Sequence, residues 1–504
     1  MNHNPVYLTT PIYYVNDVPH IGHAYTSIAT DVLARFYRLY GIQVLFSTGV
    51  DEHGQKIEQA ASKAGLSPQE YCDKISHVFR TMSQGMNISE DVFIRTTEPR
   101  HKAAAQALWN RLVEKDQIYL GSYSGWYSVR DETFFAESEL VDGKAPTGAD
   151  VEWVDEPSYF FRMSEWQEPL LRYYREHPEF IGPDSRRNEV MRFVESGLRD
   201  LSVSRSTFKW GVPVPNDPDH VMYVWVEALC NYLTVVDFPD IQDQDFKTFW
   251  PNAVHIVGKD IIRHHAVYWP ALLMAADLPL PHRIFAHGWW TKDGQKISKS
   301  VGNTIDPFAL TEEYGIDPVR YFLMREVPFG KDGDYSDAAF KHRVNGDLAN
   351  DLGNLAQRVL SFVQKQLEGR IPHCHELQEV DHRMLDMVKA LPDQILPFVD
   401  TQEIHRICEI IWAVVGEANR YVDSQQPWAL KKTDTVRMET VLYVLMDTIK
   451  RVAIMTQPLM PVSCNRMLDY LGVDKHVRDL SIYDQPLTSE HLLPNPEPIF
   501  PRIE

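Results

Sequence analysis

Two short segments of the sequence carry side chains suited to handling phosphate groups. The first is His20-Ile21-Gly22-His23, where two imidazoles stand three residues apart at the expected start of a helix. A helix N-terminus attracts anions through its backbone N–H groups and its dipole, and Gly22 leaves room for a nucleotide to approach the backbone. The segment indicates a nucleotide site; the alternative is a pair of surface histidines that cap a helix.

The second segment is Lys296-Ile297-Ser298-Lys299-Ser300, which follows the turn-forming Asp293-Gly294-Gln295. Two lysines three residues apart on a mobile loop can close over a triphosphate and stabilise charge on a leaving pyrophosphate. The spacing differs from that of a Walker P-loop. For a lysine pair taken alone, a solvated basic loop is the alternative.

Strand and helix patterns predict how these segments are positioned. A strand at residues 6–10, a helix from about 20 to 40 and a strand at 44–48 form a βαβ unit, which predicts a parallel sheet. Strands at 253–257 and 284–287 run into Gly258-Lys259-Asp260 and Gly288-Trp289-Trp290. Open α/β sheets bind ligands at this edge, just past the strand ends.

The rest of the chain predicts further domains. We expect an α/β, Rossmann-like parallel-sheet catalytic domain at residues 1–115 and 221–335, interrupted by an inserted, partly β connective domain at 116–220. Beyond residue 335, apolar residues recur at helical spacing, as in Ile404, Ile407 and Ile411 and again in Val441 and Leu445. Residues 336–504 are therefore predicted to form a stem-contact region followed by an all-α helical bundle.

Taken together, the two segments resemble the HIGH and KMSKS signatures of class I aminoacyl-tRNA synthetases, with Ile297 where Met is usual. Within that class the chain is similar to the methionyl-tRNA synthetase family along nearly its whole length. The segments that carry the similarity are Thr10–Asn16, Thr48–Gly54, Tyr223–Leu229, Gly258–Ile261 and His287–Trp290.

The resemblance implies an activity in two steps. L-methionine is activated with ATP to methionyl-adenylate, and the methionyl group is then transferred to the 3′ end of tRNA(Met). The implied catalytic residues are His20, His23, Lys296 and Lys299. The implied ATP-binding residues are His20, Gly22, His23, Asp260, His287, Gly288 and Lys299.

The implied methionine site needs apolar walls for the thioether and a carboxylate for the ammonium group. Asp51 is the candidate ammonium partner, and Tyr232 and His265 are candidates for a polar contact to sulfur. The full implied set is Ile12, Tyr14, Asp51, Val224, Trp225, Ala228, Leu229, Tyr232, Ile261 and His265. Without the resemblance, core packing is the better reading of Val224, Trp225 and Leu229.

The resemblance also implies that the helical bundle binds the anticodon. Asn354 and Arg358, at i and i+4, share a helix face and can hydrogen-bond bases, while Trp428 can stack on one. The alternative is an exposed arginine and a tryptophan that packs on Pro427.

Composition narrows the remaining possibilities. The net charge of −20 argues against unguided nucleic-acid binding but not against a local RNA surface.

Five dispersed cysteines without C-x-x-C spacing predict no structural zinc and no metal ligand, and the loop His373-Cys374-His375-Glu376 has no second cluster nearby. We expect Mg²⁺ to accompany ATP through phosphate oxygens. No signal peptide or membrane span is evident, so a cytoplasmic location is expected. The resemblance implies a monomer, because the extra C-terminal dimerisation module of some relatives is absent.

Three other readings stay open at this point. The chain could be a class I synthetase for another amino acid, such as cysteine or leucine. It could be a nonribosomal adenylyl or nucleotidyl transferase that uses an HxGH signature. It could also be an inactive RNA-binding relative, which the intact histidine and lysine signatures disfavour.

Overall fold

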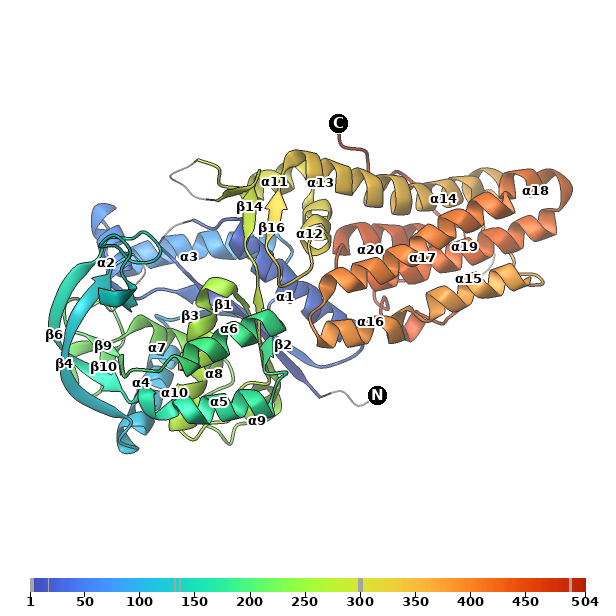
Figure 1. Cartoon of the computed structure of the whole chain (residues 1–504). Coiled ribbons are helices and arrows are strands. Elements are labelled where there is room, and N and C mark those ends of the chain that lie inside the picture. The colour runs from blue at the N-terminus through green and yellow to red at the C-terminus, as the bar shows by residue number, and fades with distance from the viewer. Residues whose placement is uncertain (1–3, 17, 131–132, 136, 298–301, 489–491) are drawn as a thin grey trace. The chain divides into compact units, whose positions relative to one another are not determined.

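The computed structural model describes residues 4–16, 18–130, 133–135, 137–297, 302–488 and 492–504, so the predicted catalytic Lys299 lies outside the described residues. The chain forms two compact units, each built from segments distant in sequence (Figure 1). Unit 1 comprises Met1–Pro19, Val44–Gln84 and Glu90–His287, and unit 2 comprises His20–Gln43, Gly85–Ser89 and Gly288–Glu504.

Unit 1 is built on a parallel sheet. Its strands in the described chain, in spatial order, are β3 (Val92–Arg95), β2 (Val44–Asp51), β1 (Val6–Tyr14), β12 (Ala253–Gly258), β13 (Arg283–His287) and β7 (Ile181–Gly182). Each neighbouring pair is parallel. Strands β1 to β3 run outward on one side and β12 to β13 on the other, so the order reverses between β1 and β12, while the earlier β7 takes the outer edge. This is the doubly wound arrangement predicted from the sequence.

The strands of this sheet are apolar for a physical reason. A parallel sheet is covered on both faces, so its central strands bury most of their residues instead of alternating apolar with polar ones. In β12, for example, Ala253 to Val257 are all buried. The helices and helical turns of unit 1 in the described chain are α2 (Gln55–Lys63), α3 (Pro68–Gly85), α4 (Pro99–Glu114), η1 (Glu137–Glu139), η2 (Met163–Trp166), α5 (Gln167–Glu176), α6 (Asp184–Glu195), α7 (Val224–Leu229), α8 (Asn231–Thr234), α9 (Gln244–Phe249), η3 (Trp250–Asn252), η4 (Lys259–Ile261), η5 (His264–Tyr268) and α10 (Trp269–Ala275).

The predicted insertion is β-rich, as expected, and also contains α5 and α6. Its longest strands, β4 (Ile118–Ser128) and β6 (Glu152–Phe161), pair in antiparallel register and are flanked by β5 (Thr133–Phe135) and β8 (Leu201–Ser202). A smaller sheet holds β9 (Ser204–Arg205), β10 (Pro213–Val214) and β11 (Asp217–Met222). The same segment supplies β7, which pairs with β13 and so forms the edge of the main sheet.

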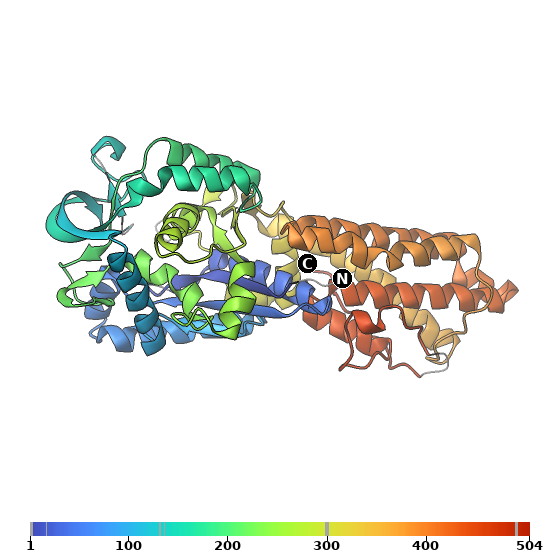
Figure 2. The ribbon, with the colours of Figure 1, turned by 90° about the horizontal axis from the view of Figure 1, so that it is seen from below.

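Unit 2 is mostly helical. Its helices are α1 (Ile21–Leu39), α11 (Pro307–Tyr314), α12 (Ile316–Arg325), α13 (Asp337–Arg343), the π-helical η6 (Val344–Gly353), α14 (Asn354–Gln366), α15 (Glu379–Lys389), α16 (Leu391–Asp400), α17 (Ile404–Gln425), α18 (Pro427–Thr433), α19 (Thr435–Thr456) and α20 (Pro461–Tyr470). Figures 1 and 2 show α15, α17 and α19 lying side by side. A small sheet of β14 (Trp290–Lys292), β15 (Gln295–Lys296) and β16 (Gly333–Tyr335) completes the unit.

A buried arginine fixes helix α1 within unit 2. Arg320 of α12 is fully buried and contacts the Asp31 carboxylate of α1 at 2.6 Å. Its other N–H groups donate to the backbone carbonyls of Met86, Pro458 and Leu459. Since a buried charge is tolerated only when it is paired and hydrogen-bonded, this arginine specifies how α1 sits among the surrounding segments of its unit.

None of the described helices is both long enough and apolar enough to cross a lipid bilayer.

Candidate active site

The predicted nucleotide residues of unit 1 gather where β12 and β13 end. Gly258 and His287 are partners in neighbouring parallel strands, and Asp260 follows in the helical turn η4. A Cβ atom on Gly258 would lie 2.5 Å from Asp260 Oδ1, so a larger residue there would displace the Asp260 carboxylate. The residues stand beside the point where strand order reverses, which is where doubly wound sheets bind ligands.

The predicted methionine residues all belong to unit 1 and come from six of its elements. Ile12 and Tyr14 lie at the end of β1, and Asp51 at the end of β2. The others lie on α7 (Val224, Trp225, Ala228, Leu229), on α8 (Tyr232) and in the turns η4 and η5 (Ile261, His265). Ile12, Tyr14, Trp225 and Ile261 are only partly buried and pack against the core that contains Val224, Leu229 and Tyr232. These side chains therefore form part of the boundary of that core.

Tyr232 and His265 form a buried hydrogen-bonded pair, with 2.7 Å between Tyr232 Oη and His265 Nε2. The other ring nitrogen, Nδ1, lies 3.0 Å from the carbonyl oxygen of Ile261, which can only accept. Burial lowers the pKa of His265 to about 4, so the ring is neutral at pH 7 with its proton on Nδ1. Tyr232 therefore donates to Nε2, and its oxygen keeps acceptor capacity.

Trp225 and Asp51 are placed by neighbouring groups. The Trp225 indole stacks on His264 with 3.7 Å between ring centroids and meets His265 edge-on at 6.2 Å. Asp51 is 8% exposed and is the cross-strand partner of Tyr14. Unit 1 thus holds an aromatic stack on α7 and η5, and a carboxylate beside Tyr14 at the ends of two adjacent strands.

The residues that follow Asp51 are anchored by polar contacts that the sequence interpretation missed. The buried Glu52 carboxylate accepts from Arg95 at 2.8 Å and from Ser76 at 2.6 Å. His53 contacts Glu227, and Glu227 contacts His101. A signal was present, because Glu52-His53 and Glu227 are polar residues inside two segments that otherwise read as buried.

In unit 2, His20 and His23 fold over the first turn of α1. His20 Nδ1 accepts the backbone N–H of Gly22, and His23 Nδ1 accepts that of His20, each at 3.1 Å. The rings stack with centroids 3.9 Å apart. Burial lowers the pKa of His23 well below its usual range, and the neighbouring His20 ring lowers it further. In its neutral form each ring therefore carries its proton on Nε2, as a hydrogen-bond donor suited to phosphate oxygen.

The segments on either side of the lysine signature are also described. Lys296 lies on β15 with its ammonium group 5.4 Å from the centre of the Trp289 ring, and its carbonyl accepts from Asn303 at 3.1 Å. A few residues after the signature, the carbonyl of Ile305 accepts the N–H of Ile21 at 3.3 Å. The structure therefore brings the end of the lysine-bearing loop to the start of the histidine-bearing helix.

Gly288 is the remaining predicted ATP-binding residue. A Cβ atom there would lie 2.3 Å from the backbone carbonyl group of Lys331. Only glycine permits this approach, and the neighbouring Trp289 N–H donates to Asp332 Oδ1 at 2.8 Å. The glycine is thus required by packing within unit 2.

In the helical bundle, Arg358 and Trp428 lie together although 70 positions separate them in sequence. The Arg358 guanidinium is 5.4 Å from the centre of the Trp428 ring and also pairs with Asp423 at 2.9 Å. Trp428 is 43% exposed, and Asn354 is exposed at the start of the same helix as Arg358. The three predicted residues thus include an exposed indole beside a cation.

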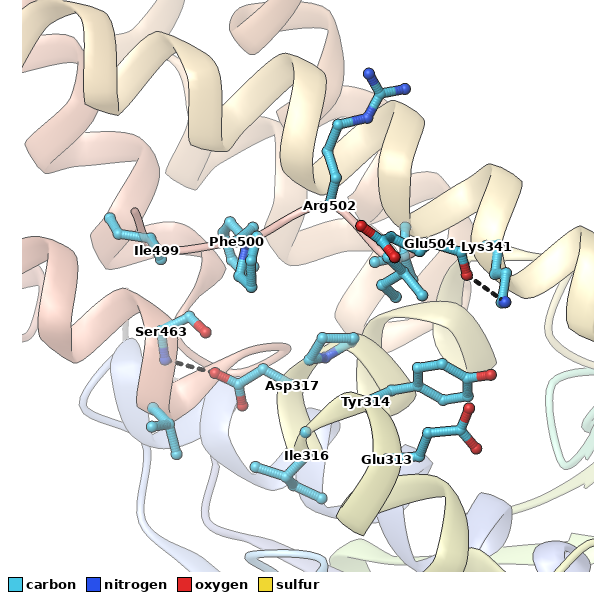
Figure 3. A pocket seen from close by; sticks show the side chains of 16 residues that line it. Glu313, Tyr314, Ile316, Asp317, Lys341, Ser463, Ile499, Phe500, Arg502 and Glu504 are labelled. Carbon is cyan, nitrogen blue, oxygen red and sulfur yellow. Dashed lines mark hydrogen bonds between the residues drawn. The ribbon is translucent and has the colours of Figure 1, made fainter. Parts of the chain in front are cut away.

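A cavity of about 550 Å³ in unit 2 lies apart from all these residues. It is lined by the start of α12, by α20 and by the C-terminal tail, in which Phe500 is buried (Figure 3). The Asp317 carboxylate in its wall accepts the N–H of Ser463 at 2.5 Å and so caps α20. None of the predicted site residues lines this cavity, so we assign it no part in the activity.

Comparison with known proteins agrees with this geometry. Residues 6–152 and 138–360 match the family model described as tRNA synthetases class I (M), and residues 371–504 match the anticodon binding domain of methionyl tRNA ligase. These matches and the doubly wound sheet define a class I tRNA synthetase.

Similarity to individual proteins narrows the class further. The chain is 53% identical to the methionine–tRNA ligase of Rickettsia felis, covering 99% of each chain, and 52% identical to that of Brucella suis, covering 100% of this chain and 98% of the other. The Mycobacterium tuberculosis methionyl-tRNA synthetase solved with methionyl-adenylate superposes with a TM-score of 0.97 at 50% identity, covering 99% of this chain and all of the other. The chain belongs to the methionine–tRNA ligase family.

Proposed function

We propose that the chain ligates methionine to tRNA(Met) in two steps. The methionine carboxylate attacks the α-phosphorus of ATP, and pyrophosphate leaves as methionyl-adenylate forms. A hydroxyl of the tRNA 3′-terminal ribose then attacks the adenylate carbonyl carbon, and AMP leaves. The observation that carries the proposal is the full-length match to a synthetase solved with methionyl-adenylate.

We assign methionine to the residues at the ends of β1 and β2 and on α7, α8, η4 and η5. Asp51 pairs with the ammonium group, and Trp225, Leu229 and their neighbours enclose the thioether. The Tyr232 hydroxyl already donates a hydrogen bond to His265. Tyr232 therefore contacts the sulfur through its ring and its oxygen, not through an O–H donor. The pair is a fixed, neutral surface, which suits a weakly polar thioether.

We assign the nucleotide to His20, Gly22, His23, Asp260, His287, Gly288, Lys296 and Lys299. The attacking carboxylate is already an anion, so no general base is required, and catalysis is mainly positioning and charge stabilisation. The Nε2–H donors of His20 and His23 bind phosphate oxygens, and the two lysines stabilise the departing pyrophosphate.

Mg²⁺ accompanies ATP in this scheme without a protein ligand of its own. The groups assigned to the triphosphate are imidazole N–H donors and ammonium groups, whereas Mg²⁺ prefers oxygen ligands. Phosphate oxygens supply those ligands.

No residue is assigned to zinc, since the insertion lacks cysteine thiolates. A cytoplasmic monomer is the form in which we expect the enzyme to act.

We assign the tRNA anticodon to Asn354, Arg358 and Trp428. Their exposure and the contact between the guanidinium and the indole suit the stacking and hydrogen bonding by which proteins read unpaired bases. A net charge of −20 means that tRNA binding must depend on such local contacts more than on the overall field.

Amino-acid-dependent exchange of pyrophosphate into ATP tests the proposal. We expect exchange with methionine and much weaker exchange with leucine, cysteine, isoleucine and valine at equal concentrations. A stronger response to another amino acid would reject methionine as the substrate. Exchange with methionine but no charging of any tRNA would point instead to a free-standing adenylating enzyme.

A further inference from the structure

A carboxylate with two histidine partners is buried beside the residues assigned to methionine. Glu227 is 1% exposed. Its Oε1 lies 3.0 Å from His53 Nδ1, and its Oε2 lies 2.7 Å from His101 Nε2. Both imidazoles are themselves buried. Each carboxylate oxygen is thus committed to one ring.

Hydrogen bonding defines the charge of this cluster. Burial alone would raise the pKa of Glu227, but the charges and hydrogen bonds of His53 and His101 outweigh it and lower the pKa to about 2. The Thr234 hydroxyl donates to the Cys230 carbonyl at 3.0 Å, so it meets His101 Nδ1 as an acceptor at 3.2 Å. Each nitrogen of the His101 ring thus has an oxygen partner, the Thr234 hydroxyl or the Glu227 carboxylate.

Glu227, His53 and Thr234, which is a hydrogen-bond partner of His101, each lie next to residues assigned to methionine. Glu227 lies on α7 between Trp225 and the pair Ala228-Leu229. His53 follows Asp51 by two residues, and its backbone N–H approaches Asp51 Oδ1 at 3.5 Å. Thr234 follows Tyr232 by two residues on α8. The cluster therefore links three separate segments that carry the assigned site residues.

We propose that Glu227 is a positioning residue of the methionine site, which holds α7 against the segment after β2 through His53 and against α4 through His101. The inference rests on the proposed function. Glu227 contacts no substrate; it fixes the distance between Asp51, which binds the ammonium group, and the Trp225–Leu229 wall, which binds the thioether.

A carboxylate suits this role better than an apolar side chain would. Apolar packing is non-directional and permits small displacements, whereas charge-assisted hydrogen bonds are short, directional and stronger than neutral ones. Burial of the charge is tolerated because both oxygens are paired. The gain is a defined geometry between segments from different parts of the chain.

Steady-state exchange kinetics on the full-length enzyme test the inference. In Glu227→Gln, whose amide is of equal size but uncharged and can accept from only one ring, we expect the KM for methionine to rise at least tenfold and the KM for ATP to stay within twofold. Leu273→Ala is the matched control: it truncates a buried side chain of α10 outside the cluster. It should lower the melting temperature without a selective effect on methionine.

Two further variants separate positioning from folding and provide a route if Glu227→Gln does not fold. His53→Ala should raise the KM for methionine, and His53→Asn should restore it, because an asparagine amide can place a donor near the position of Nδ1. A folded Glu227→Gln with unchanged methionine KM would overturn the inference, as would equal increases in both KM values or failure of His53→Asn to rescue. Absence of methionine-dependent exchange in the wild type would instead reject the proposed function.

Discussion

The backbone of the first signature determines which ring nitrogens of its histidines carry protons. Both Nδ1 atoms accept backbone N–H groups at the start of α1, so the Nε2–H groups are the donors. The two residues thus cap a helix and present phosphate-binding groups at once. The capping alternative considered from the sequence and the nucleotide-binding interpretation are compatible, because they use different atoms of each ring.

Gly22→Ala tests this arrangement. A Cβ atom at position 22 would lie 2.9 Å from His20 Cε1, so the ring must leave its place over the first turn. We expect the rate of methionyl-adenylate formation, followed by quenched flow, to fall by about 10²-fold, the usual loss for one misplaced transition-state donor. Gly346→Ala is the control, since a Cβ atom there meets nothing within 4 Å; similar losses in both variants would contradict the role of the His20 ring.

His265 gives a prediction about pH. Its pKa is about 4 in the folded protein and about 6.5 when exposed. As pH falls from 6.5 towards 4, the unfolded chain binds a proton that the folded chain does not, so stability falls over that window, by about 3 kcal/mol from this group alone. Denaturant unfolding of His265→Gln should show a shallower decline between pH 6.5 and 4.5. An identical decline would mean that other groups account for it.

At the scale of helices and strands, periodicity predicted most elements but not their surroundings. The regular spacing of apolar residues predicted α1, α17 and α19, and apolar runs predicted β1, β2, β12 and β13. It did not show that α19 is buried on all sides from Thr440 to Thr456. Nor did it predict the π-helical turns η5 and η6 or the pairing of β7 with β13, because each depends on contacts between segments distant in sequence.

The element that carries Trp428 provides a direct test of tRNA recognition. Trp428 is the second residue of α18 and is 43% exposed. Loss of one stacking side chain typically costs about 1–3 kcal/mol, so Trp428→Ala should reduce kcat/KM for tRNA by about 5- to 150-fold with pyrophosphate exchange unchanged. Trp153→Ala, at another exposed tryptophan in β6, is the control. Equal loss of exchange and charging in Trp428→Ala would show that the residue serves the fold.

The sequence also predicted only part of the candidate site. Motifs predicted the residues expected to touch substrates, because such residues are recognisable by type and spacing. They did not point to Glu227, His101 or the Arg320–Asp31 pair, whose partners are 126 and 289 positions away in the chain. A buried charge becomes understandable only once its partner is known.

At the scale of the whole molecule, the residues assigned to methionine activation come from both units, whereas those assigned to the anticodon come from unit 2 alone. The methionine residues belong to unit 1, whereas the two signatures and the anticodon residues belong to unit 2. The account therefore predicts that substitutions fall into separable classes. Some substitutions impair methionine activation and therefore tRNA charging as well, and others impair only tRNA charging.

Lys299→Ala belongs to the first class. Removing its ammonium group should lower both adenylate formation and tRNA charging by about 10²–10³-fold, because charge on the leaving pyrophosphate loses a partner. The KM for methionine should change little. Single-turnover measurements of both steps on the same preparation check this, and normal adenylate formation would contradict the assigned role.

The most direct test of the central claim follows a single methionine through both steps. Purified enzyme, ATP, labelled methionine and tRNA(Met) are mixed, and adenylate, AMP and aminoacylated tRNA are quantified over time. We predict that methionyl-adenylate forms first and decays as methionyl-tRNA and AMP appear in equal amounts. Adenylate that forms but never passes its methionyl group to tRNA, or faster charging with another amino acid, would contradict the account.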